Sequence, residues 1–293
     1  MRRRSGIYQI TGSAAKKVVY KVMFSYSGLT GRIISAAITV FLSIMALLCV
    51  LPFIHVIAKT LSGPGPVQAG WVGLVPAEFT IDAYRWALGD SRLWGSFINS
   101  FIRLALGVSL NMAITVLAAF PLSFEKRRFP GRTVYAWFFL IIILFEPGIL
   151  PNFVLLNEIG LTGTIWALIL PRGVQALHIF LLLIFFRGIP SEIIEATWID
   201  GASHFRCLMQ VMLPLVIPAL ATLALYSILF HWNSWLDGFL YLKDTRQYPL
   251  QTFLYARGLP LVYIVISIIP LVILFPFLQR HMNRAFMLGA VKG

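Results

Sequence analysis

Two charged residues, Glu146 and Arg172, lie inside long apolar stretches of the chain. A charge within a membrane span costs several kcal/mol unless it is paired or hydrated, so such residues are candidates for function. Arg172 is 15 residues from Arg187, and Glu146 is 14 residues from Arg132. In helices that rise about 1.5 Å per residue, both lie about 21 to 22 Å from the same end of their spans. We expect Glu146 and Arg172 to face each other or to share a water-filled cavity, as a structural ion pair or as part of a translocation path.

The sequence lacks the motifs that carry catalysis or metal binding. It contains no G-x-x-x-x-G-K phosphate loop, no HExxH, and no Ser/His/Asp set in a motif context. Cys49 and Cys207 do not form a CxxC pair. No carboxylate stands at metal-ligand spacing from His55, His178, His204 or His231, which we interpret as packing residues. We predict no catalytic residue, no metal site and no cofactor in this chain.

The composition indicates a membrane protein. Of 293 residues, 59% are hydrophobic and only 12% are charged, with a mean hydropathy of +0.83, whereas soluble domains carry about 25% charged residues. This makes a soluble enzyme improbable. The net charge of +13 is spread between apolar runs rather than gathered on one module, which favours a lipid bilayer over nucleic acid as the partner.

The apolar runs predict six transmembrane helices in an all-α, polytopic fold. A span needs roughly 20 apolar residues. Charge-free stretches predict four spans, at 33–58, 104–124, 207–236 and 258–279. The apolar region between Arg132 and Arg187 is broken by PGILP at 147–151 and divides into spans at 133–153 and 163–186.

The basic residues predict the orientation. The N-terminal tail, the 121–132 loop, the 187–206 loop and the C-terminal tail hold sixteen Lys and Arg residues, and the opposite segments hold seven. Cytoplasmic segments retain positive charge, so both termini are predicted to be cytoplasmic. Arg103, about 33 Å above Glu125, is predicted to snorkel to the outer surface. We expect no cleaved leader, a basic tail over 1–32, a membrane domain over 33–280 and a tail over 281–293.

The cytoplasmic stretch 190–214 reads PSEIIEATWIDGASHFRCLMQVMLP and predicts a short helix, a turn and a second helix. Pro190 can open the first helix, and Glu192 and Glu195 favour its positive N-terminal end. Gly201 supplies a left-handed residue that ends it, and Ser203 can cap the second helix.

This stretch resembles the EAA loop of ABC importer permeases, whose pattern is Glu-Ala-Ala, three residues, Gly, nine residues, Ile, one residue, Leu-Pro. Glu195, Ala196, Gly201, Leu213 and Pro214 match it. Thr197 replaces the second Ala and Val211 replaces the Ile, which are mild departures. The resemblance implies the type I permease fold and a coupling role for Glu195, Ala196, Asp200, Gly201, Ala202 and Pro214.

Three more segments narrow the resemblance to the smaller permease of carbohydrate importers of the maltose type, with the alginate-importer branch suggested by the chain as a whole. They are FFRGIP (185–190), FHWNSWLDGF (230–239), where Ser234 and Trp235 depart from the commonest residues, and the ending GAVKG (289–293). In relatives this terminus inserts between the ATPase subunits, which implies coupling roles for Gly289 and Lys292.

The resemblance implies a sugar path through the membrane, and Arg172 could meet a carboxylate of an acidic sugar. The candidates for this path are Arg172, Glu146, Trp232, Asn233 and Gln175. Trp137, Trp166 and Trp235 could offer aromatic faces, although single Trp residues near span ends are more often interfacial anchors. Asn111 and Gln175 either line the channel or bond across helices.

We therefore expect a non-catalytic permease subunit of an ABC importer for oligosaccharides, in the bacterial inner membrane. The implied partners are a second, homologous permease, two ATPase subunits that bind ATP and Mg²⁺, and an extracytoplasmic sugar-binding protein that docks on outer loops 59–97 and 237–257. A secondary transporter or channel driven by an ion gradient is the alternative, with Glu146 and Arg172 as its ion site, but it leaves the EAA pattern unexplained. A membrane-embedded enzyme lacks a catalytic set.

Overall fold

The computed structural model describes residues 29–125, 128–145 and 147–290 and confirms an all-α fold. Within these ranges there is no strand, and the β-type pairing is limited to an isolated bridge between Ser62 and Phe79. The chain divides into two compact units, Met1–Ile81 and Asp82–Gly293.

The first unit is a long apolar helix followed by a folded turn. The helix α2 (Leu29–Thr60) is long and apolar enough to cross a membrane, and its most apolar window is exposed along its length. A helix that is apolar on every side belongs in lipid or against other helices. Beyond it, α3 (Pro64–Gln68) and the following loop fold back. The Ser62 hydroxyl donates to the Ala58 carbonyl over 2.6 Å and accepts from the Ala77 amide over 3.0 Å.

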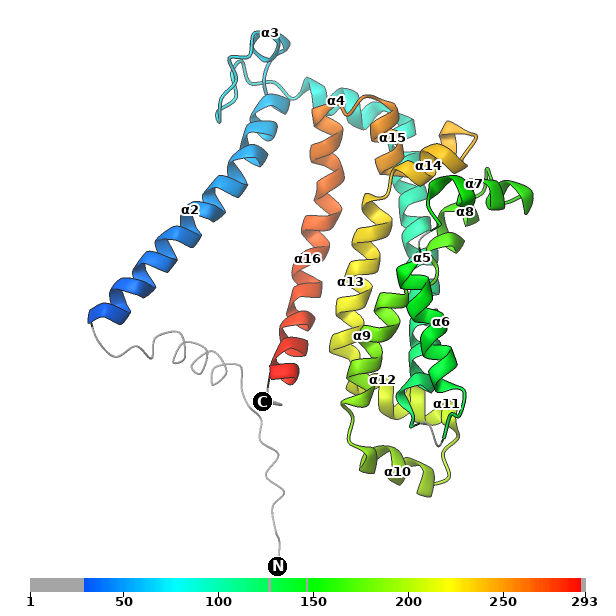
Figure 1. The fold of residues 1–293 in the computed structure, drawn as a ribbon. Helices are drawn as coiled ribbons and strands as arrows, with labels where there is room; N and C mark the ends of the chain where they lie inside the picture. The colour runs from blue at the N-terminus through cyan, green and yellow to red at the C-terminus, as the bar shows by residue number, and fades with distance from the viewer. Residues whose placement is uncertain (1–28, 126–127, 146, 291–293) are drawn as a thin grey trace, which may run out of the picture. The chain divides into compact units, whose positions relative to one another are not determined.

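The second unit is a helical bundle (Figure 1). Its elements are α4 (Asp82–Gly89), α5 (Ser91–Ser123), α6 (Arg132–Leu144), α7 (Ile149–Glu158), α8 (Trp166–Ile169), η1 (Leu170–Arg172), α9 (Ala176–Arg187), α10 (Ser191–Ile199), α11 (His204–Arg206), the π-helical η2 (Cys207–Met212), α12 (Leu213–Leu215), α13 (Ile217–Asn233), α14 (Leu236–Tyr241), η3 (Thr245–Gln247), α15 (Leu250–Ala256) and α16 (Leu261–Ala290). Helix α5 packs against α9 and α13, and α16 packs against α13.

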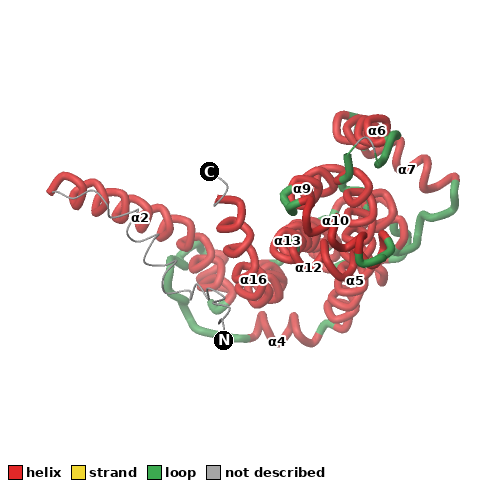
Figure 2. Tube along the Cα trace, turned by 90° about the horizontal axis from the view of Figure 1, so that it is seen from below, coloured by secondary structure: helices red, strands yellow, loops and turns green. Residues whose placement is uncertain are grey.

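Two apolar clusters hold this bundle together at its opposite ends. One, around Leu122, Ile179 and Phe186, lies toward the end that carries α10, and the other, around Leu168 and Tyr263, lies toward the end that carries α14 and α15. Seen from below, α10 and α12 lie over the ends of α5, α9 and α13 (Figure 2). Segments that leave the bundle at its two ends are thus held by separate cores.

The six predicted spans correspond to two long helices, three broken helix pairs and one shorter apolar helix among the described residues. Among the described residues, α2 and α5 pass as single spans, and three further spans are broken: α6 with α7, α8 and η1 with α9 at a bend of 50°, and α11 to α12 with α13 at a bend of 83°. The last predicted span corresponds to the apolar part of α16, Leu261–Pro276.

Two predicted span boundaries are wrong. The predicted span 207–236 begins too early, because α13 starts at Ile217 and the preceding residues form a separate arm. Pro214 and Pro218 lack the N–H groups that would continue one helix through this point. The predicted span 104–124 begins too late, because α5 starts at Ser91, where the Asp90 carboxylate caps it by accepting from the Arg92 amide over 3.0 Å.

Candidate functional site

Segment 190–214 folds as the sequence predicts, into two helical pieces joined by a tight turn. Pro190 directly precedes α10, and Gly201 ends the helix with φ +76°. A side chain at Gly201 would meet open space but would be strained by that backbone angle. The Ser203 hydroxyl caps α11 by accepting from the Arg206 amide over 3.3 Å. The turn is therefore set by local chemistry.

Most of the predicted coupling residues in this segment are exposed to solvent. Glu195, Ala196, Asp200, Gly201 and Pro214 are exposed and Ala202 is half-buried. Two large apolar side chains stand exposed beside them, Ile199 at 86% and Phe205 at 65%. An exposed helix that carries both polar and large apolar groups is suited to binding another protein.

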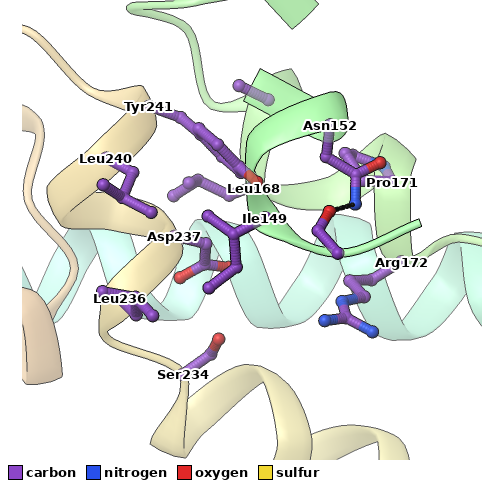
Figure 3. A pocket seen from close by; sticks show the side chains of 12 residues that line it. Ile149, Asn152, Leu168, Pro171, Arg172, Ser234, Leu236, Asp237, Leu240 and Tyr241 are labelled. Atoms are coloured by element: carbon purple, nitrogen blue, oxygen red, sulfur yellow. Dashed lines mark hydrogen bonds between the residues drawn. The ribbon is translucent and has the colours of Figure 1, made fainter. Parts of the chain in front are cut away.

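At the other end of the bundle, a cavity of about 150 Å³ lies between the α8 region and α14 (Figure 3). Its lining includes Arg172, Asp237, Ser234, Asn152 and Tyr241 together with apolar side chains. The Asn152 amide donates to the Gly148 carbonyl over 2.7 Å and so holds the cavity wall. The guanidinium of Arg172 also lies 5.4 Å from the centre of the Phe230 ring.

Of the other predicted path residues, none of the described ones lines this cavity. Trp232 is 3% exposed and packs between Phe97 and Phe101, because its ring completes the apolar cluster at this end. Asn233 is exposed and donates to the Leu229 carbonyl over 2.9 Å. Gln175 is half-buried and contacts the Arg172 carbonyl over 3.5 Å.

For three predicted residues, the structure gives no side-chain position. Glu146 and Lys292 lie outside the described residues, so their predicted roles stay predictions. Gly289 lies within the backbone of α16.

The prediction that Arg103 snorkels to the surface is wrong. Its side chain is fully buried and donates to both carboxylate oxygens of Asp237 and, over 3.2 Å, to the Ser234 carbonyl. The Gly238 amide donates to the same carboxylate over 2.8 Å. Arg103 therefore ties α5 to the corner between α13 and α14, and Asp237 enters the cavity lining already paired.

Sequence reasoning missed this pair. The two residues are 134 positions apart, and the predicted start of the span before Asp237, at 207, gave a wrong depth for it because α13 begins at Ile217.

Asn111 bonds across helices, which settles one of the alternatives left open by the sequence. Its side chain is fully buried and donates to the Gly173 carbonyl over 3.1 Å, while its oxygen lies 3.2 Å from Nδ1 of His178. Gly173 stands in the break between η1 and α9, where the helix leaves a carbonyl without its usual partner. Broken backbone at membrane depth requires such a partner from a neighbouring element.

Among the described residues no group of three or more His, Cys, Asp or Glu side chains could hold a metal ion. Within the described ranges, the two candidate sites are the exposed helix pair around Gly201 and the cavity that contains Arg172 and Asp237. Neither holds a nucleophile paired with a base. The first presents exposed polar and apolar side chains, and the second is lined by charged and hydrogen-bonding groups.

The comparisons with known proteins agree on one family. No family model matches the chain. It is 32% identical over 285 residues to the polygalacturonan/rhamnogalacturonan transport system permease protein YtcP of Bacillus subtilis (strain 168), covering 89% of this chain and 99% of the relative. It is 28% identical over 277 residues to the arabinooligosaccharides transport system permease protein AraQ of Halalkalibacterium halodurans, covering 90% and 99% of the two chains.

A solved structure supports the same assignment. One chain in the crystal structure of a bacterial ABC transporter involved in the import of the acidic polysaccharide alginate superposes with a TM-score of 0.80 at 27% identity, covering 87% of this chain and 98% of that chain. These relatives match this chain over nearly their full length, and the solved one also shares its fold. They belong to the same class of protein that the sequence pattern of segment 190–214 resembles. The chain belongs to the family of permease subunits of carbohydrate ABC importers, which are multi-pass proteins of the bacterial inner membrane.

Proposed function

We propose that this chain serves an ATP-driven importer of acidic oligosaccharides and that α10 with its turn at Gly201 couples it to the ATPase subunits. The observation that carries the coupling role is the exposed helix pair itself, in which Glu195, Ala196 and Gly201 match the EAA pattern and are exposed. A short rigid helix attached to a bundle can act as a lever when a partner moves it.

The partners follow from this role. Two ATPase subunits bind ATP and Mg²⁺ and receive α10, while this chain performs no hydrolysis. A second, homologous permease completes the translocation path, and an extracytoplasmic sugar-binding protein docks on the loops at the opposite end. Both termini are cytoplasmic in this arrangement, and Gly289 and Lys292 contribute to the contact with the ATPases.

The acidic substrate is supported by chemistry and by likeness. A galacturonan carries carboxylates, and the solved relative is described as importing an acidic polysaccharide. Arg172 lines the cavity of this chain, and a guanidinium can bind a carboxylate through two parallel hydrogen bonds. Asp237 does not oppose this role, because Arg103 already balances its charge.

The test of coupling uses the complex purified through a tag on this chain and reconstituted in liposomes. We expect Glu195→Lys and Gly201→Val each to lower the rate of ATP-dependent uptake tenfold or more. The first inverts the charge at a contact, and the second forces a β-branched residue into the left-handed backbone conformation of Gly201. Glu192→Gln, on the first turn of the same helix, is the control and should retain uptake. Uptake driven by an ion gradient without ATP would overturn the proposal.

The same liposomes test the substrate. An oligogalacturonate should stimulate ATP hydrolysis more than a neutral oligogalactoside of equal length, and Arg172→Gln should reduce this preference about tenfold or more, because a charged hydrogen-bonding group contributes at least about 1.5 kcal/mol. Equal stimulation by both probes would contradict the acidic substrate but leave the coupling role intact.

A further inference from the structure

Arg128, in the loop between α5 and α6, contacts the exposed helix α10 at two positions. The guanidinium of Arg128 lies 3.8 Å from the centre of the Trp198 ring, and its Nη2 atom lies 3.9 Å from Oε1 of Glu195. Trp198 and Glu195 stand one turn apart on α10. One side chain therefore reaches two positions of the helix from a segment that joins two membrane helices.

Trp198 is enclosed by three groups that do not belong to α10. Phe124, directly after α5, lies 5.7 Å from the Trp198 ring centre, and His204 of α11 lies 5.9 Å from it. Phe124 and His204 also meet edge to face at 6.1 Å. The indole nitrogen of Trp198 is buried and has no hydrogen-bond partner within the described part of the chain. Its ring is thus held through its faces and edges.

The two contacts of Arg128 differ in strength. The side chains of Arg128 and Glu195 are 47% and 57% exposed, so water and salt screen their attraction and the ion pair contributes little. Trp198 is half-buried, and a planar guanidinium over an indole face gains more as water is excluded. Stacking on Trp198 is the stronger contact, and lysine cannot reproduce it, because its ammonium is not planar.

The contact between Arg128 and Trp198 helps to hold α10 in place, because little else lies between α10 and part of the bundle. A cavity of about 770 Å³ separates part of α10 from the bundle, lined by Ser191 and Glu195 on one side and by Phe186 and Arg187 on the other. Ile194, which also lines this cavity, packs against the apolar core of the bundle, and the enclosure of Trp198 adds a second contact. Without the second contact, α10 could rock into the cavity.

We propose that Arg128 is a positioning residue that clamps α10 to the loop between α5 and α6, so that movement of α10 reaches both of these helices directly. This inference rests on the proposed coupling role of α10. It adds a second route for movement, besides the covalent connections of α10 to α9 and α11. In this route the loop, through Arg128 and Phe124, moves with the helix.

Hydrogen–deuterium exchange of the purified complex tests the clamp without relying on transport. In Arg128→Gln we expect amides of Ser191–Ile199 to exchange about fivefold faster than in the wild type, because removing one stacking contact shifts the local opening equilibrium by about this factor. Arg128→Lys should fall between the two. Arg132→Gln removes another guanidinium that lines the same cavity and should leave the exchange unchanged. Unchanged exchange in Arg128→Gln would overturn the clamp.

The second measurement is the number of sugar molecules imported per ATP hydrolysed in liposomes. Arg128→Gln should lower this ratio at least about threefold while the complex stays assembled, with Arg132→Gln near the wild-type ratio. Faster exchange with an unchanged ratio would overturn the transmission of movement through the loop. If Glu195→Lys also left the ratio unchanged, the coupling role itself would fail, which separates the two failures.

Discussion

The buried pair of Arg103 and Asp237 predicts a measurable stability effect. Arg103 is fully buried and the side chain of Asp237 is only 18% exposed, so removing either partner leaves a charge without its counter-charge where water solvates it poorly. We expect Arg103→Met to lower the free energy of unfolding by about 3 to 5 kcal/mol. Thermal unfolding of the purified complex in detergent, followed by near-ultraviolet circular dichroism, measures this change.

The double variant Arg103→Met with Asp237→Leu is the matched control for charge. It removes both members of the pair and should recover most of the loss, because apolar replacement of an entire buried pair is often neutral. A double variant as unstable as Arg103→Met would show that the arginine acts through packing rather than through its charge.

Single residues were predictable from the sequence where their surroundings are local. The roles of Pro190, Gly201 and Ser203 follow from rules that need only a few neighbours along the chain, and the structure confirms them. Arg103 was not predictable in the same way, since its partner lies 134 residues away. Trp232 likewise looks available in the sequence but is enclosed by Phe97 and Phe101 of α5.

At the scale of elements, the approach of α5 to α13 depends on one small residue. A Cβ atom at Gly107 would lie 2.7 Å from the ring of His231 on α13. We expect Gly107→Ala to destabilise the protein by about 1 to 3 kcal/mol, because overpacking forces a rigid ring or the backbone to move. The same unfolding measurement in detergent tests it.

Gly95→Ala provides the control, because it lies on the same helix but faces open space. Alanine should there gain helix propensity and leave the protein as stable or more so. Equal losses in both variants would mean that α5 responds to any added methyl group rather than to contact with His231.

The sequence predicted that the membrane helices exist, but it predicted only some of the places where they are interrupted. The PGILP motif predicts the interruption after α6, because proline and glycine act locally. The break at Gly173 also carries a local mark, Pro171 and Gly173, but was not predicted, and Asn111 of another helix stabilises it. The arm that precedes α13 was predicted as part of a span, because hydropathy records length and polarity but not direction.

At the scale of the whole molecule, the positive charges predict which end of the bundle faces the cytoplasm. Helices α11 and α14 lie at opposite ends of the second unit (Figure 1). Arg206 closes α11 and Arg246 lies in η3, just beyond α14. The charge balance, together with the proposed contact of α10 with ATPases, requires the end with Arg206 to be cytoplasmic.

Labelling of single cysteines tests this orientation. The variants are made in a protein in which serine replaces Cys49 and Cys207. A membrane-impermeant maleimide is added to cells whose outer membrane is permeabilised and whose inner membrane is intact, and it should label Arg246→Cys. It should label Arg206→Cys only after the inner membrane is opened, because both side chains are exposed but on opposite faces of the bilayer. The reverse pattern would invert the topology and remove α10 from the reach of any cytoplasmic ATPase. Labelling of both sites in intact cells would mean that the bundle does not separate two compartments.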